Sequence, residues 1–299
     1  MLQLIAGVLL LCASGAAHAH HVAADAGNTD LALASVIVAS LLLYALGIAR
    51  LWKRAGPGRG IRFGQAARFG LGWVALAAAL LSPIDALSGD SFAVHMIQHE
   101  LLMVVAAPLL VLGRPLEAWA SALPKTVNHA FAGVARFGPL RWLWRWITEP
   151  VGAWCLHALC LWVWHLPLLF DAALADTRVH IAQHASFFGS ALAFWWAVFG
   201  RGARLPNALS MASLVTTMLH TGALGALLTF APTAWYAHYA QGAFGLSALE
   251  DQQLGGLVMW LPGSLSYLVA ALVIAARWLR DPREPSRPPS RIGDSRAPP

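Results

Sequence analysis

Seven stretches of the chain are long and apolar enough to cross a bilayer, and nearly all of the charge lies between them. The sequence is 58% hydrophobic and 11% charged, whereas about a quarter of the residues of a soluble domain are charged. Lipid offers no hydrogen bonds to the backbone, so spans of about 20 residues form helices. We therefore predict an all-α, polytopic membrane helix bundle. The predicted spans are 31–51, 67–87, 92–112, 150–170, 179–199, 208–230 and 252–276.

The charges in the loops predict the orientation of this bundle. If the mature N-terminus lies outside, every one of the 20 lysines and arginines except Arg178 falls on the inner side. Positive charge in short loops marks the cytoplasmic side of a membrane protein. The sequence therefore predicts an outer N-terminus and an inner C-terminus. The net charge of +6 is explained by topology, and no nucleic-acid partner is expected.

The segments outside the spans have their own signatures. Residues 1–19 contain a short apolar run that ends in Ala17-His18-Ala19, which is typical of a cleaved signal peptide, although an uncleaved helix is the alternative. The helical domain would then cover residues 20–280. Residues 281–299 are rich in Pro, Ser and Arg, and we expect a disordered cytoplasmic tail. The long loop 114–149 mixes tryptophan with arginine, so an interfacial helix is expected on the inner face.

Two of the predicted spans carry a pair of histidines four residues apart. His95 and His99 open the third span, and His180 and His184 open the fifth. Residues four apart lie on one face of a helix. Ionisable groups inside a membrane are costly and usually face the interior of the bundle at a functional site. The two pairs therefore predict one shared polar site near the outer face.

Further histidines, together with those pairs, suggest a metal site. Imidazole is the commonest metal ligand and suits copper, zinc and iron. Single intramembrane histidines can instead be hydrogen-bond partners between helices, and Asp251 can simply cap its own helix. The candidate metal ligands are His95, His99, His165, His180, His184 and His220. Supporting candidates are Met96, Glu100 and Asp251, together with His20, which would be the first residue after signal-peptide cleavage.

Several segments resemble the CtaG family of cytochrome c oxidase assembly factors, in its bacterial multi-span form. The most specific are QHELL at 98–102 and DQQLGGLVMW at 251–260, and the resemblance covers roughly residues 31–280. It implies a multi-pass protein of the bacterial inner (plasma) membrane, with a periplasmic N-terminus, that helps a haem-copper oxidase of the respiratory chain to mature. The implied partners are an oxidase subunit, membrane lipid and a periplasmic copper chaperone. The family's motif residues would be His95, His99, His165, His184, His220 and Asp251.

We thus expect a non-catalytic assembly factor that binds copper and passes it to the oxidase. Two alternatives stay open: a membrane oxidoreductase with haem held between facing histidines, and a copper transport or resistance protein. A purely structural scaffold is a further alternative. Cys155 and Cys160 lie on different faces of one helix and form no CxxC pair, so no cysteine site is expected.

Overall fold

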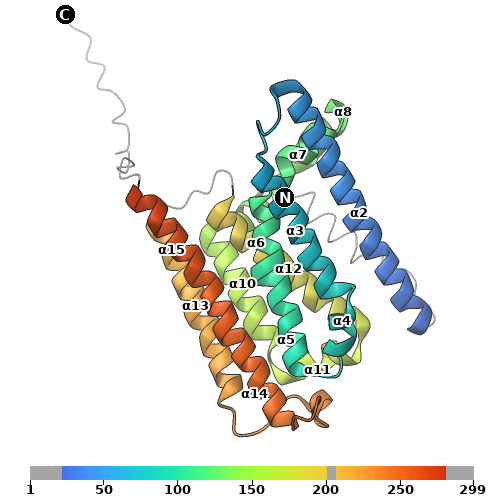
Figure 1. Cartoon of the computed structure of the whole chain (residues 1–299), viewed down its shortest axis with the longest axis vertical. Helices are drawn as coiled ribbons and strands as arrows, with labels where there is room; N and C mark the ends of the chain where they lie inside the picture. The colour runs from blue at the N-terminus through green and yellow to red at the C-terminus, as the bar shows by residue number, and fades with distance from the viewer. Residues whose placement is uncertain (1–21, 201–206, 281–299) are drawn as a thin grey trace, which may run out of the picture.

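The computed structural model describes residues 22–200 and 207–280, and these residues form helices and loops without a named strand (Figure 1). The predicted signal peptide, His20 and the predicted tail lie outside the described residues. The elements of the first half are α2 (Val22–Ala55), α3 (Phe63–Leu80), α4 (Pro83–Ser88), α5 (Phe92–Glu100), η1 (Leu101–Ala106), α6 (Ala107–Leu112), α7 (Pro115–Ala122), α8 (Lys125–Arg136) and α9 (Gly138–Thr148). Those of the second half are α10 (Pro150–Trp164), α11 (Pro167–Ala175), α12 (Thr177–Phe199), α13 (Asn207–Thr229), η2 (Ala237–Tyr239), α14 (Ala248–Val258), η3 (Met259–Gly263) and α15 (Ser264–Arg280).

The helical fold class is confirmed, and the number of spans is confirmed in part. Five stretches of helix are long and apolar enough to cross a membrane, and a sixth is added if the bent pair α10 and α11 counts as one span. Helix α12 contains the predicted span 179–199 and has 23 residues, but it is not among these six. Its first turns carry polar residues, which lower its apolar character: Arg178, His180, Gln183 and His184.

Two of the membrane helices change pitch in their middle. Helices α5, η1 and α6 run continuously as one candidate span, Phe92–Leu112, and η1 is a π-helical turn that begins directly after Glu100. The last span contains a second π-helical turn, η3, with Pro262 inside it. Proline has no N–H to donate within the helix, and single π-turns occur often near functional sites.

The break between α10 and α11 is sharper. The two helices are bent by 77°, and the break falls at His165 and Leu166, just before Pro167. The residue before a proline is disfavoured in helical geometry, and Leu166 is accordingly extended, with ψ 129°. The predicted span 150–170 therefore contains a bend near its C-terminal end, where the chain turns aside as α11.

Close helix approach holds the bundle together. Gly225 of α13 lies against Gly256 of α14, where an added Cβ would be only 2.8 Å from the Gly256 carbonyl oxygen. Small residues allow such approach between membrane helices. In the centre, Trp195 stacks on Tyr267 at 5.5 Å and donates to the Met103 carbonyl at 2.8 Å. These contacts join α12, α15 and η1 around one core.

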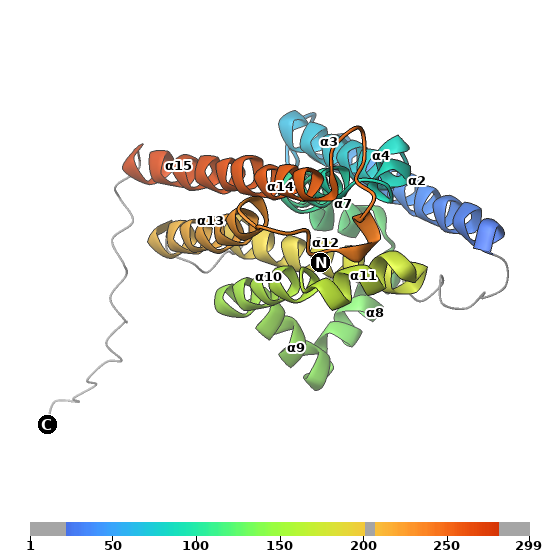
Figure 2. The same cartoon turned by 90° about the horizontal axis from the view of Figure 1, so that it is seen from below.

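The loop 114–149 folds into three short helices rather than one. Helix α7 packs along α2, where Gly47 touches the backbone of Ala118 and Arg50 donates to the Ala122 carbonyl. Helices α8 and α9 project from the side of the bundle next to α10 (Figure 2). The interfacial role of this loop stays a prediction.

Candidate metal centre

Three segments bring five histidines to one place inside the bundle. Helix α5 supplies His95 and His99, and α12 supplies His180 and His184. His165 comes from the break between α10 and α11. The spacing of four residues stacks each pair along one helix face, and α5 and α12 turn these faces toward each other.

The five rings form a connected group. The centroids of His95 and His99 are 4.3 Å apart, and those of His180 and His184 are 4.2 Å apart. Across the two helices, His95 lies 5.4 Å from His180 and 5.9 Å from His184, and His99 lies 5.2 Å from His184. His165 completes the group at 6.4 Å from His99. The predicted shared site of the two pairs therefore exists as a cluster of imidazoles.

A hydrogen-bond chain determines which nitrogen of His95 carries the proton. The Tyr239 hydroxyl donates to the Ser88 carbonyl at 2.7 Å, so it can accept from His95 Nδ1, which lies 3.1 Å away. Burial, and then the Asp251 carboxylate, raise the pKa of Tyr239 above its ordinary value, so the hydroxyl stays protonated and donates. With the proton on Nδ1, the lone pair of His95 is on Nε2, which points to His99 Nε2 at 2.9 Å. In metal sites, the ring nitrogen that does not bind the metal commonly donates a hydrogen bond, as His95 Nδ1 does here, and this bond orients the histidine.

His165 is oriented in the same way by the backbone. Its Nδ1 donates to the Leu161 carbonyl at 2.7 Å, and its own carbonyl accepts from the Tyr236 hydroxyl at 3.0 Å. The other ring nitrogen, Nε2, is buried and has no partner. The broken helix therefore presents a free imidazole lone pair to the site.

Other nitrogens of the cluster are also buried without a hydrogen-bond partner. They are Nδ1 of His99, Nε2 of His180 and Nε2 of His184. Buried polar groups in proteins are nearly always paired, so each exception calls for an explanation. Imidazoles with such unpartnered nitrogens could serve as ligands of a metal ion.

The spacing fits a metal ion after small movements. Ligand nitrogens of His95, His180 and His184 all lie within 4.8 Å of one another. An imidazole nitrogen sits about 2.0–2.1 Å from a bound zinc ion, so three ligands of one ion lie at most about 3.6 Å from one another. Rotations of the three side chains that move each ring nitrogen by about 1 Å would close this difference.

Aromatic rings enclose the cluster. Phe187 lies 4.7 Å from His99 and 5.9 Å from His165, and Phe170 lies 5.1 Å from His95. Phe170 itself packs against Tyr236 at 4.4 Å. An apolar shell limits water access and sets the local dielectric of a metal site.

The loop between α13 and α14 covers the site. It carries Tyr236 and Tyr239, which reach His165 and His95, and it is held down by side chains of the helices around it. Gln252 accepts from the Trp235 N–H at 2.6 Å, and Asp171 accepts from the N–H groups of Ala237 and His238. We call residues 231–247 the cover loop. The sequence indicated no role for its tyrosines, because their reach depends on how the loop folds back.

Asp251 caps a different helix from its own, whose N-cap is Ser247. Its carboxylate accepts from the Ser91 hydroxyl at 2.7 Å and from the N–H groups of Phe92 and Ala93 at 2.7 and 3.2 Å. These are the first N–H groups of α5, which otherwise lack helical partners. Asp251 thus caps the helix that carries His95 and His99. In the sequence it lies 160 residues after Ser91.

The other candidates lie elsewhere. His220 of α13 faces Trp154 at 5.6 Å and makes no ring contact with the five clustered histidines, because its helix packs on α10 further along the bundle. Met96 packs with Phe92 and Met259 and contacts Gly255. Glu100 lies against Gly263 of η3, with Oε2 buried and unpartnered.

Comparisons with known proteins agree with this picture. Proteins of Mycobacterium bovis and Mycobacterium tuberculosis, both named as uncharacterized, are 26% identical over 263 residues, which is 84% of this chain. An uncharacterized protein of Mycobacterium leprae is 25% identical over 70% of the chain. The chain spans 39% of the length of the first two relatives and 33% of the third.

No solved structure matches the chain. The family described as cytochrome c oxidase caa3 assembly factor matches residues 42–281, a range that contains all five clustered histidines, the cover loop and Asp251. The resemblance of the QHELL and DQQLGGLVMW segments to this family is therefore confirmed. The chain belongs to the family of cytochrome c oxidase caa3 assembly factors.

Proposed function

We propose that this assembly factor binds copper at the five-histidine cluster and passes it to a subunit of a haem-copper oxidase, without catalysing a reaction itself. The single observation that carries the proposal is the cluster itself: five imidazoles from three segments, of which His95, His180 and His184 bring ring nitrogens within 4.8 Å of one another. Imidazole donors suit copper, and copper binds such sites more tightly than the other divalent first-row metals.

The proposed setting is a bundle of seven spans in the bacterial inner membrane, with α12 as the seventh and the cluster near the periplasmic face. A periplasmic copper chaperone would then be the donor. Support comes from the loop charges, which place the basic residues on the side opposite to the cluster. When copper is bound, it is cargo for the oxidase rather than a reagent.

Haem does not fit the same histidines. His95 Nε2 and His99 Nε2 are 2.9 Å apart, and Phe187 lies against the rings of His99 and His165. A porphyrin needs a flat space between two facing axial ligands, and the rings here contact one another instead. The cluster therefore favours a bare ion over the haem oxidoreductase alternative.

A copper channel through the membrane is also disfavoured. The next histidine inward, His157, is hydrogen-bonded on both sides, to the Ser190 hydroxyl at 3.1 Å and the Tyr267 hydroxyl at 3.3 Å. Both nitrogens are occupied, so His157 offers no free lone pair as the next ligand. Cys155 is exposed on the outside of the bundle. Transport would need polar groups through the whole thickness.

The direct test is the metal content of the detergent-purified protein. We expect copper to copurify, or to bind when Cu(I) or Cu(II) is added, and we expect no Soret absorbance band. Zinc in place of copper under copper-replete growth would refute the metal assignment. A strong Soret band would support the haem alternative. Absence of any metal after copper loading would leave only a scaffolding role.

Tyr239→Phe is expected to weaken copper binding about tenfold without loss of the fold, because the partner of a metal-binding histidine contributes 10- to 100-fold to affinity. The variant leaves His95 free to adopt the other tautomer. Affinity would be measured by competition with a chromogenic copper chelator. Tyr44→Phe is the matched control, since the Tyr44 hydroxyl also donates to a backbone carbonyl but at Gly113, outside the cluster. Equal losses in both variants would contradict the tautomer argument.

A further inference from the structure

Helix α9 has a surface that the histidine site does not use. It has no buried residue, and its sequence alternates tryptophan with arginine. Trp142 is 69% exposed and Trp146 is 44% exposed, and Phe137 just before the helix is 65% exposed. Large apolar side chains exposed together indicate an interaction surface rather than chance.

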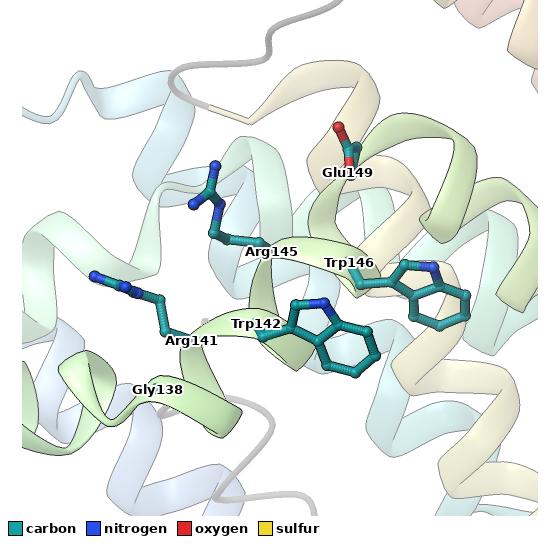
Figure 3. Close-up of a pocket in the computed structure, with 6 residues that line it drawn as sticks. All are labelled: Gly138, Arg141, Trp142, Arg145, Trp146 and Glu149. Atoms are coloured by element: carbon teal, nitrogen blue, oxygen red, sulfur yellow. The ribbon is translucent and has the colours of Figure 1, made fainter.

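The two kinds of side chain point in different directions. Arg141 and Arg145 are four residues apart and extend to one side of α9, whereas Trp142 and Trp146 extend to the other (Figure 3). Between them is a shallow depression that is also lined by Gly138 and Glu149. Neither guanidinium has a hydrogen-bond or ion-pair partner among the described residues. Two unpartnered cations thus lie beside the two indoles.

The position of α9 fixes this surface at the end of a membrane helix. Pro150 begins α10 directly after α9 ends at Thr148, and α10 begins the bent span. Trp144, on the remaining face of α9, packs against Ala153 and Ala193. Gly152 allows the start of α10 to lie close to α9, because a Cβ at this position would be 2.1 Å from the Trp146 carbonyl oxygen. Helix α9 is therefore anchored to the bundle at the boundary where a span starts.

We propose that the arginine and tryptophan faces of α9 form a binding site for the headgroup of an anionic phospholipid such as phosphatidylglycerol. Guanidinium groups bind phosphate oxygens in bidentate geometry, and tryptophan settles at the level of the headgroups. Glu149 is the one acidic residue lining the depression, so two positive charges face one negative charge and the balance favours an anion.

The occupant is a lipid rather than a free phosphate because of the tryptophan side. A soluble phosphate would use the two arginines and leave the indoles of Trp142 and Trp146 in water. A lipid satisfies both faces at once, since its phosphate meets the arginines and its acyl chains meet the indoles. Amphipathic helices of this composition lie in the interface plane of a bilayer.

The test compares lipid binding by two double variants of the full chain in detergent. Arg141→Gln/Arg145→Gln removes the proposed site, and Lys53→Gln/Arg54→Gln removes two exposed charges at the end of α2 as the matched control. Native mass spectrometry would measure retained phosphatidylglycerol against phosphatidylcholine. We expect the α9 variant to lose about 30-fold in affinity for phosphatidylglycerol, given the contribution of each basic residue near an anionic surface. The control should lose much less.

Three results would overturn the proposal: equal losses in both variants, no preference for phosphatidylglycerol over phosphatidylcholine in the parent, or displacement of the lipid by millimolar inorganic phosphate. As a second readout, brominated phosphatidylglycerol should quench less tryptophan fluorescence in Trp142→Phe/Trp146→Phe than in the parent. Copper binding should be unchanged in the α9 variant, which separates this site from the proposed function.

Discussion

The variant His99→Ala/His184→Ala is expected to lose copper binding by about 100-fold or more, since removal of a supporting residue alone costs up to that amount. The two residues come from facing helices and lie 5.2 Å apart, so the change removes one ligand from each side of the cluster. Copper per chain would be measured by mass spectrometry after loading and desalting. Oxidase activity of cells that carry the variant should fall with it.

The fold should survive this change. Nδ1 of His99 and Nε2 of His184 are buried without partners, so the change breaks one hydrogen bond, between His99 Nε2 and His95 Nε2, at a net cost of about 1 kcal/mol. His220→Ala is the matched control, because it also removes an intramembrane histidine but lies outside the cluster. If His220→Ala lost copper to the same extent, the five-histidine site would be the wrong assignment.

Asp251→Ala is expected to destabilise the protein by about 3 kcal/mol, because it leaves a buried hydroxyl and two helix N–H groups without their charged acceptor. The side chain is 1% exposed and accepts three hydrogen bonds from the start of α5. The thermal unfolding midpoint in detergent should fall, and hydrogen exchange should become faster in α5. Copper affinity should fall as well, since His95 lies in the second turn of that helix.

Two further variants separate the effect of the Asp251 cap on α5 from that of negative charge at the start of α14. Glu250→Ala changes the neighbouring acid, which bonds only to Ser247 within its own capping box, and it should leave exchange in α5 unchanged. Asp251→Asn keeps one acceptor oxygen and should lie between the parent and Asp251→Ala. A fall of equal size in Glu250→Ala would show that charge at the start of α14, rather than the cap on α5, is what matters.

Much of the fold follows from the sequence because lipid imposes a simple rule on helix length and polarity. The third span was predicted at 92–112, and the structure has it at Phe92–Leu112. The first begins at Leu31 in both, and the last two differ by a few residues. The second ends early, at Leu80, because Ser82 and Pro83 start the separate helix α4.

The histidine pairs could be predicted for the same reason, since spacing alone places two rings on one face of a helix. Which faces meet is a tertiary property that spacing does not specify. His165 joins the cluster because of the 77° bend after α10, and His220 stays out because of how α13 packs. The roles of Tyr239 and Asp251 depend on contacts between residues 144 and 160 positions apart, which no local pattern encodes.

The three consecutive residues Asp251, Gln252 and Gln253 have a mechanical consequence. The first caps α5, and the other two hold the cover loop through Trp235 and Ala231. One turn of α14 therefore joins two parts of the site: helix α5, which carries His95 and His99, and the cover loop. Helix α12, with His180 and His184, lies on the opposite side of the cluster. Any widening between α5 and α12 separates the two histidine pairs, so the affinity for the proposed ion would depend on the distance between these helices rather than on one side chain.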